Sequence, residues 1–167
     1  MQIVLGLEAR NIDWSSSYVV GKSNEGIYRK LIKSDFMGVM PYSNFILLYG
    51  ARNTGKTHIA NVWKEKYNAK LISGIDSLSK YSALYDSSYV LCEDIHLFEG
   101  KELFHIFNMI CEKSLRCLMT TSKYPYVNDL VDVQSRIRSI FSMELNYISI
   151  DMIQKVFINL LDSYEVI

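Results

Sequence analysis

The sequence has no excess of charge of either sign, because 18 lysines and arginines balance 18 aspartates and glutamates. A neutral domain lacks the long-range field that draws proteins onto nucleic acid, so direct sequence-specific DNA binding is not expected. The chain also lacks an apolar run near the ~18 residues of a membrane span. Its N-terminus lacks the basic and apolar regions of a secretion signal. We therefore expect a cytoplasmic protein, without membrane contact, whose partners are another protein and a small ligand.

Cysteine is scarce and odd in number. The three cysteines, Cys92, Cys111 and Cys117, lie within apolar runs and share no metal-ligand spacing. We interpret them as reduced core residues rather than disulfide partners or zinc ligands. The 167 residues, of which 49% are apolar and 22% charged, suit one globular domain with a buried core.

Strand-like and helix-like segments alternate along the chain. Apolar runs of β composition lie at 44–49, 69–73, 89–92, 116–120 and 141–148, and helical spacing of apolar residues covers 56–67, 77–84, 101–113 and 153–161. Another helix is predicted from a cap at Ser23 through Ile32. Strands buried on both faces and separated by helices predict an α/β fold, with a five-stranded, mainly parallel sheet flanked by helices.

Residues 50–57 read GARNTGKT and match the phosphate-binding pattern GxxxxGK[ST] at every fixed position. Glycines allow a tight loop whose backbone N–H groups point into one concavity, and the following helix directs its positive end to the same place. Lys56 supplies a charge for the β- and γ-phosphates, and the Thr57 hydroxyl is a candidate Mg²⁺ ligand. A chance glycine-rich turn is the weaker interpretation, because a strand precedes the loop and an amphipathic helix follows it. The sequence thus predicts a P-loop NTPase fold that binds ATP or ADP with Mg²⁺.

A buried strand ends in two carboxylates at residues 89–94, which read YVLCED. A carboxylate at the tip of a strand beside the P-loop can hold Mg²⁺, and its neighbour can orient the attacking water. We assign the metal role to Glu93 and the water role to Asp94. A strand that ends in solvated charges is the alternative.

With both motifs placed, the flanking residues resemble the AAA+ module of the bacterial replication initiator DnaA. The likeness is carried by 18–24 (YVVGKSN), 50–59 (GARNTGKTHI), 93–96 (EDIH), 101–108 (KELFHIFN), 118–125 (LMTTSKYP) and 133–137 (VQSRI). It implies an AAA+ nucleotide-binding base domain over residues 11–150. The nucleotide would be bound by Val19, Val20, Gly50, Asn53, Thr54, Gly55, Lys56, Thr57 and His58, and the backbone of the 18–24 segment would border the adenine. Ser122 would sense the γ-phosphate, with Thr120 and Thr121 as alternatives.

The first seven residues, MQIVLGL, resemble the QLxLxL clamp-binding signature of Hda, the DnaA-related regulator. In that family the segment docks on the replicative sliding clamp, and the protein then promotes hydrolysis of DnaA-bound ATP. The resemblance implies a clamp-binding segment at 1–10, with contacts from Gln2, Ile3, Leu5 and Leu7. A short N-terminal strand is the alternative. Arg136 would be the arginine finger that acts on DnaA, and Arg138 is the alternative.

AAA+ proteins of this group carry a helical lid with an arginine that reaches the nucleotide. The resemblance places the start of a truncated lid, or a closing helix, at 151–167. We expect the regulator function to survive a missing lid better than hydrolysis by the chain itself. A stand-alone P-loop ATPase of loader type and a degenerate DnaA-like scaffold are the alternative functions. His58, His96 and His105 have no metal spacing, so we expect their side chains to have packing or surface roles.

Overall fold

The protein is described by a computed structural model over residues 13–33, 44–73, 87–127 and 129–163. The predicted helix at 77–84 and the segment 1–10 lie outside the described residues. The sheet has the order β2-β3-β4-β1-β5, and all neighbouring strands are parallel. Its strands are β1 (Phe45–Tyr49), β2 (Lys70–Ser73), β3 (Tyr89–Glu93), β4 (Arg116–Thr121) and β5 (Phe141–Glu144). The predicted five-stranded parallel sheet is confirmed.

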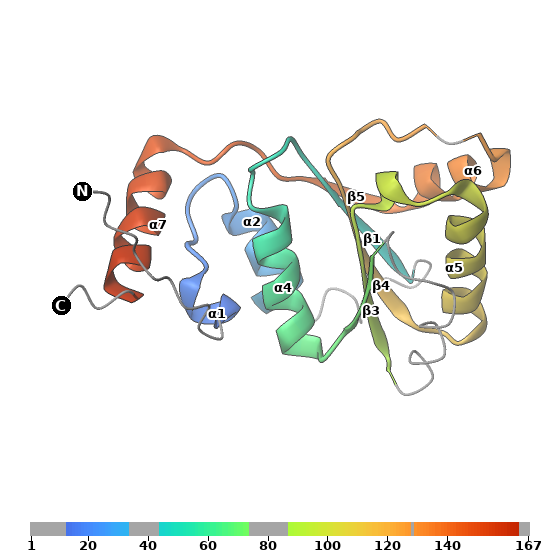
Figure 1. Ribbon diagram of the computed structural model, residues 1–167, viewed down its shortest axis with the longest axis horizontal. Helices are drawn as coiled ribbons and strands as arrows, with labels where there is room; N and C mark the ends of the chain where they lie inside the picture. Colours follow the sequence, from blue (N-terminus) through green and yellow to red (C-terminus); the bar gives the residue numbers. More distant parts are fainter. Residues whose placement is uncertain (1–12, 34–43, 74–86, 128, 164–167) are drawn as a thin grey trace, which may run out of the picture.

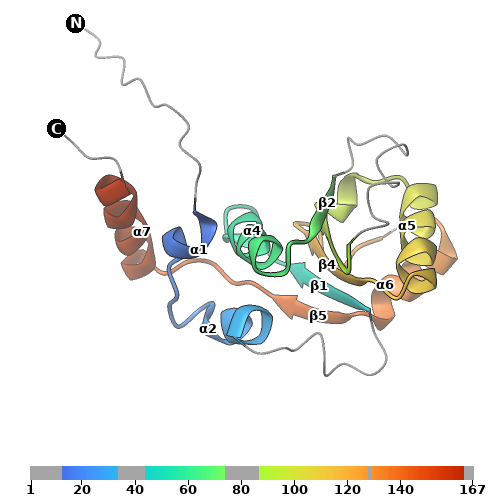
Figure 2. The ribbon, with the colours of Figure 1, turned by 90° about the horizontal axis from the view of Figure 1, so that it is seen from below.

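Two helical layers cover the sheet (Figures 1 and 2). One face carries α4 (Lys56–Tyr67), α2 (Glu25–Tyr28) and the π-helical turn η1 (Arg29–Lys33), and α1 (Trp14–Ser17) packs against the side of α4 that is turned away from the sheet. The other face carries α5 (Gly100–Glu112) and α6 (Val131–Ser139), with the short 3₁₀ turn η3 (Ile95–Leu97) between β3 and α5. The last helix, α7 (Ile150–Ser163), lies at the end of the molecule remote from α5 and α6.

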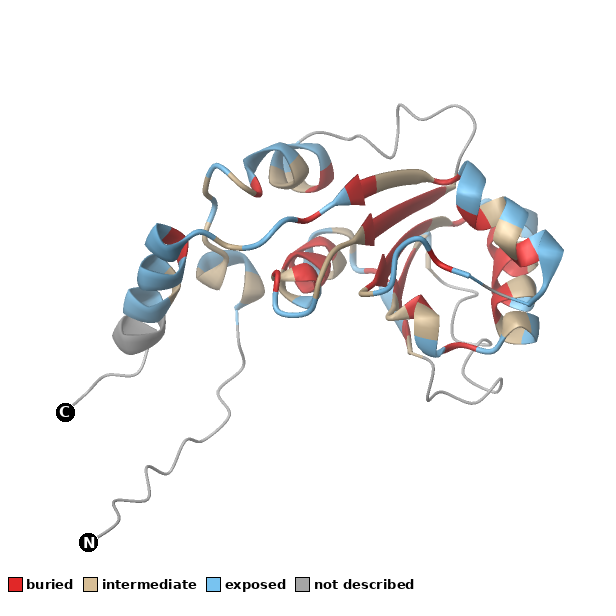
Figure 3. Ribbon diagram, turned by 90° about the horizontal axis from the view of Figure 1, so that it is seen from above, coloured by how far each residue is buried: buried red, intermediate tan, exposed pale blue. Residues whose placement is uncertain are grey.

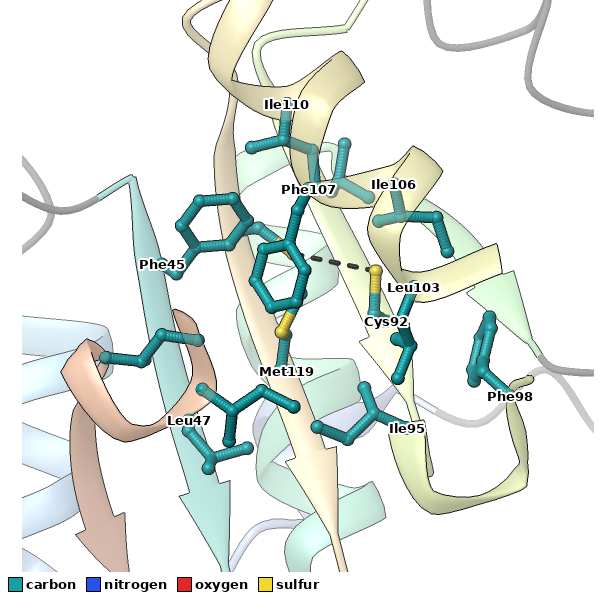
Figure 4. Close-up of a cluster of buried hydrophobic side chains, with 14 of the residues drawn as sticks. Phe45, Leu47, Cys92, Ile95, Phe98, Leu103, Ile106, Phe107, Ile110 and Met119 are labelled. Atoms are coloured by element: carbon teal, nitrogen blue, oxygen red, sulfur yellow. Dashed lines mark hydrogen bonds between the residues drawn. The ribbon is translucent and has the colours of Figure 1, made fainter. Parts of the chain in front are cut away.

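The sheet separates two apolar clusters, because strands such as Phe45–Tyr49 place alternate side chains on opposite faces. Leu47 contributes to the cluster under α5 and α6, whereas Ile46 and Leu48 contribute to the cluster under α4. Figure 4 shows the first cluster, with Phe107 of α5 directed onto the strands. The rings of Phe45 and Phe107 meet edge to face at 4.9 Å.

The cysteine prediction is right for two residues and wrong for the third. Cys92 and Cys117 are buried on neighbouring strands, with their sulfur atoms 3.6 Å apart (Figure 4). Cys111 is exposed, because its position on α5 faces away from the sheet.

The predicted cap at Ser23 is wrong, since α2 begins after Asn24. The Asn24 amide instead closes the preceding loop. Its Oδ1 accepts from Gly21 N at 2.8 Å, and its Nδ2 donates to the Tyr18 hydroxyl at 2.9 Å and to Val19 O at 3.0 Å. These bonds use the side chain that would otherwise cap the helix.

The last strand is shorter than predicted, ending at Glu144 instead of residue 148. Leu145 N still donates to Tyr49 O at 2.7 Å, after which the chain leaves the sheet toward α7. That helix is anchored through Met152, which is 5% exposed and meets Gly21 and Ser23. Most of its other described side chains are exposed (Figure 3). Within the described ranges, no helix combines the length and hydropathy that crossing a membrane requires.

Candidate nucleotide-binding site

The P-loop connects β1, an inner strand of the sheet, to α4. Asn53 and Gly55 both have positive φ values, 64° and 90°, so the loop curls tightly ahead of the helix. Its closure is supported by the Thr54 hydroxyl, which donates to Ala51 O at 3.0 Å. Successive N–H groups of such a loop and the N-terminus of a 12-residue helix together form an anion-binding concavity.

The Lys56 ammonium is held inside this loop. The residue is 7% exposed, and its Nζ donates to Ala51 O at 2.5 Å and lies 3.5 Å from Thr54 Oγ1. Burial lowers the pKa of Lys56, and the charge of Asp94 partly opposes that shift. The P-loop cation and the acidic strand end therefore share one electrostatic environment.

The carboxylates at the end of β3 differ in their surroundings. Glu93 is the last strand residue, and its Oε1 is buried with no hydrogen-bond partner among the described residues. Asp94 has a positive φ of 51°, and its backbone N–H donates to Thr120 Oγ1 at 3.0 Å. A buried carboxylate oxygen without a partner is costly unless a cation or donor completes it. Glu93 thus suits the Mg²⁺ role expected of it, together with the exposed Thr57 at the start of α4.

The three sensor candidates follow one another at the end of β4. Thr120 and Thr121 are buried, at 1% and 0% exposure, and are engaged within the fold, Thr120 by Asp94 N and Thr121 by the backbone of Lys123. Ser122 is partly exposed. Because Tyr49 pairs with Thr121 in the parallel ladder, Ser122 comes level with Gly50, the first residue of the P-loop. The register is compatible with the predicted sensor role of Ser122.

The expected adenine-side residues Val19 and Val20 lie in the loop between α1 and α2. Val19 is partly buried and Val20 is 39% exposed. The loop is held against α4 through Tyr18, whose ring meets that of His58 edge to face at 5.0 Å. This packing joins the candidate adenine side to the helix that begins at the P-loop.

His58 turns its side chain toward α1. Its Nε2 lies 3.0 Å from Ser17 Oγ and 3.2 Å from Trp14 O, and its ring meets that of Trp14 at 5.3 Å. These contacts support the packing role for the side chain. A role in nucleotide binding stays a prediction. Burial, the largest cause, lowers the pKa of His58, opposed by the Trp14 carbonyl and Glu65.

We expect the free energy of unfolding to fall between pH 7.5 and 5.5, and to fall less in His58→Gln. The His58 pKa is below 6.5 in the folded state, so the unfolded chain binds the proton first as the pH drops. The stability is present above pH 6.5 and is lost below it until the folded pKa is reached. Urea unfolding at several pH values measures this. Equal pH dependence of the wild type and His58→Gln would contradict the assignment.

The two arginines proposed as a finger lie in the last turn of α6, on the face of the sheet opposite α4 (Figure 2). The guanidinium of Arg136 packs over the rings of Phe104 and Phe107, at 5.2 and 5.9 Å from their centroids. Arg138 is exposed. Because α4 and α6 cover opposite faces of the sheet, neither arginine is part of this chain's own P-loop.

Comparison with known proteins decides the family. Residues 64–148, just over half of the 167, match the family described as the bacterial DnaA ATPase domain. This chain belongs to that family. The chromosomal replication initiator protein DnaA of Helicobacter hepaticus is 30% identical over 148 residues, which cover 75% of this chain and 32% of the relative. The chain therefore spans about a third of that DnaA.

Solved structures share the fold. A structure described as a DNA replication initiation factor has a TM-score of 0.69 at 20% identity, and the match covers 91% of this chain and 55% of the other chain. AMPPCP-bound DnaA from Aquifex aeolicus gives 0.66 at 18% identity, with the same coverage. The Thermotoga maritima RuvB Holliday junction branch migration motor has a TM-score of 0.60 at 16% identity, and the match covers 86% of this chain and 52% of the RuvB chain. These likenesses confirm the P-loop AAA+ fold of the DnaA-like domain.

Sequence reasoning missed one side chain at this site, His96. Its ring lies between Asp94 and the end of β4, 3.4 Å from Thr121 Oγ1 and 3.3 Å from Ser122 Oγ. Because the histidines have no metal-ligand spacing, the sequence predicted only a packing or surface role for His96. The usable signal was its position three residues beyond Glu93, at the strand end that faces the sensor candidates.

Proposed function

We propose that the chain binds ATP or ADP in the hollow of its P-loop. The observation that carries the proposal is the buried Lys56 ammonium, which is directed into the loop and held there by a carbonyl of the loop itself. Phosphate oxygens can replace that carbonyl as the partners of the charge. Cationic side chains also surround the acidic strand end, since Lys123, Arg52 and Lys56 all act electrostatically on His96. Such a setting favours a polyanion.

A Mg²⁺ ion would accompany the nucleotide, held by Glu93 and Thr57. When bound, it would neutralise phosphate charge. Glu93 would supply its buried oxygen, and Asp94 would hold a water on the phosphate side. Nucleotide-bound DnaA structures, such as that with AMPPCP from Aquifex aeolicus, support the choice of an adenine nucleotide.

The test is the free energy of unfolding with and without nucleotide. At a concentration ~100 times the dissociation constant, ATP or ADP with Mg²⁺ should add about 2.7 kcal/mol. GTP at the same concentration is the control for the adenine side. If saturating ATP and ADP leave the unfolding curve unchanged, the chain is a degenerate scaffold.

At the level of the cell, we propose that the chain is a DnaA-directed regulator of replication initiation. In this proposal the segment 1–10 binds the sliding clamp and residues 11–150 form the AAA+ base domain. Residues 151–167 begin a lid or close the domain. Family membership supports a place in initiation. The position of α6 supports action in trans, since this helix lies on the face of the sheet opposite α4, the helix that begins at the P-loop. The proposed partners are therefore the DnaA initiator and the clamp.

The regulator function predicts that clamp binding and stimulation of DnaA's ATP hydrolysis can be lost independently of one another. Gln2→Ala should abolish capture by purified clamp, with Gln134→Ala as an amide control on α6. A finger supplied in trans is worth ~10³–10⁵ in rate, so a finger variant should abolish stimulation of DnaA's ATP hydrolysis. The packing of Arg136 on two rings and the exposure of Arg138 lead us to expect that loss in Arg138→Ala.

Arg136→Ala should instead lower stability by about 0.5–1 kcal/mol through the lost ring contacts. If Arg136→Ala abolishes stimulation at unchanged stability, Arg136 is the finger. Turnover of ATP by the chain alone, independent of clamp and lost in Asp94→Asn, would favour the stand-alone ATPase.

A further inference from the structure

His96 joins the acidic strand end to the sensor strand. The residue is the middle one of η3, and its side chain is 6% exposed. Its Nδ1 lies 3.8 Å from Asp94 Oδ1 and 3.4 Å from Thr121 Oγ1, while its Nε2 lies 3.3 Å from Ser122 Oγ. One imidazole therefore contacts both the carboxylate and the hydroxyl that are candidates to face the γ-phosphate.

The hydrogen bonds of Thr121 determine which ring nitrogen carries the proton. Its hydroxyl donates to Lys123 O at 3.2 Å and accepts from Lys123 N at 3.1 Å. The single hydroxyl proton is thus in use, so Thr121 Oγ1 can only accept from His96 Nδ1. The Asp94 carboxylate, when ionised, also only accepts. The Thr121 contact therefore requires a proton on Nδ1, and the negative charge of Asp94, 3.8 Å away, favours that position of the proton.

The proton on Nδ1 fixes the direction of the Ser122 hydroxyl. Burial lowers the pKa of His96, with Asp94 opposing and Lys123, Arg52 and Lys56 adding to the shift, so the ring is neutral at pH 7. A neutral ring protonated on Nδ1 has an acceptor at Nε2. Ser122 therefore donates its one proton to His96. Only its lone pairs remain for other partners.

We propose that His96 is a positioning residue that controls whether Ser122 can donate to a γ-phosphate. A phosphate oxygen accepts hydrogen bonds, so Ser122 can bind it only by withdrawing its proton from His96 Nε2. ADP has no γ-phosphate and leaves the His96–Ser122 bond intact. His96 thus lowers the preference for ATP over ADP and makes the Asp94–His96–Ser122 unit respond to the γ-phosphate. The inference rests on the proposed nucleotide binding.

Two substitutions test the two ring nitrogens of His96 separately, because each keeps the hydrogen-bonding function of one nitrogen and removes that of the other. His96→Asn places an amide N–H near the Nδ1 position, which preserves the donor toward Asp94 and Thr121 but removes the acceptor of the Ser122 proton. His96→Gln extends an amide oxygen toward the Nε2 position and preserves that acceptor. A neutral hydrogen bond is worth about 0.5–1.5 kcal/mol, which corresponds to a factor of about 2–10. His96→Asn should raise the ratio of AMPPCP to ADP affinity by this factor, and His96→Gln should restore the wild-type ratio.

The experiment measures both affinities, with Mg²⁺, for the full chain and the two variants, and records imidazole ¹⁵N spectra with the His96 signals assigned from the variants. The Nε2 signal should be that of a hydrogen-bonded acceptor without nucleotide and with ADP, and should shift with AMPPCP. Thermal melts establish that the variants are folded. An unchanged affinity ratio in His96→Asn, or identical Nε2 signals with AMPPCP and ADP, overturns this inference alone. A wild-type chain that binds neither nucleotide overturns it together with the proposed function.

Discussion

Lys56→Ala is expected to lower the affinity for ATP about 100-fold while leaving the nucleotide-free fold intact. A hydrogen bond to a charged group is worth about 1.5–3 kcal/mol. Loss of the ammonium from two phosphates therefore costs roughly 3 kcal/mol, or about two decades in the dissociation constant. Fluorescence titration with a labelled ATP analogue measures the change. The smaller anion ADP should lose less affinity than ATP.

The stability of the Lys56→Ala variant follows from the pKa of the lysine. Burial lowers that pKa in the folded state, so the folded chain binds the proton less tightly than the unfolded chain does. The charge of Lys56 therefore opposes folding. Ala51 O also keeps a donor in the variant, because the Thr54 hydroxyl lies 3.0 Å away. We expect the free energy of unfolding to change by less than about 1 kcal/mol.

A matched control is Lys64→Ala, which removes a partly buried lysine from the last turn of the same helix. It should bind ATP with wild-type affinity. Equal affinity of the wild type and Lys56→Ala would show that the ammonium does not contact the phosphates. Equal loss in both variants would point to a general electrostatic effect rather than to the P-loop.

The sheet could be predicted from the sequence because each central strand is an uninterrupted apolar run between turn residues. The start of α2 could not, because Ser23 and Asn24 are both good capping residues. What separates them is the Tyr18 hydroxyl, which engages the Asn24 amide at 2.9 Å. That contact depends on how the loop folds over α4, and no local pattern encodes it.

The same limit applies to the candidate site. The P-loop pattern identifies Lys56 because loop and lysine are contiguous in sequence. His96 meets Thr121 and Ser122 only because β3 and β4 pair in the register that places Cys92 opposite Met119. A 13-residue helix separates these strands along the chain. Periodicity predicts that both strands exist, but it does not give the register between them.

Gly50→Ala is expected to destabilise the fold by about 3 kcal/mol. A Cβ at this position would lie 2.2 Å from Leu145 O, and 3.2 Å from both Leu145 C and Thr54 Oγ1. The nearest atom belongs to the backbone of the chain leaving β5, so it cannot rotate away as a side chain would. Relief requires moving that chain from β1, which strains the bond from Leu145 N to Tyr49 O. Overpacking costs about 1–3 kcal/mol, and a lost hydrogen bond adds about 0.5–1.5.

Gly26→Ala is the matched control, because a Cβ there meets nothing within 4 Å and the residue lies inside α2. Alanine at an exposed helical position should stabilise the chain by about 0.5–1 kcal/mol relative to glycine. Urea unfolding with equal m-values would measure a difference of roughly 4 kcal/mol between the variants. The sign of each change matters more than its size, since both substitutions reduce the entropy of the unfolded chain alike. Equal stabilities would therefore mean that the chain leaving β5 at Leu145 does not approach Gly50, the first residue of the P-loop.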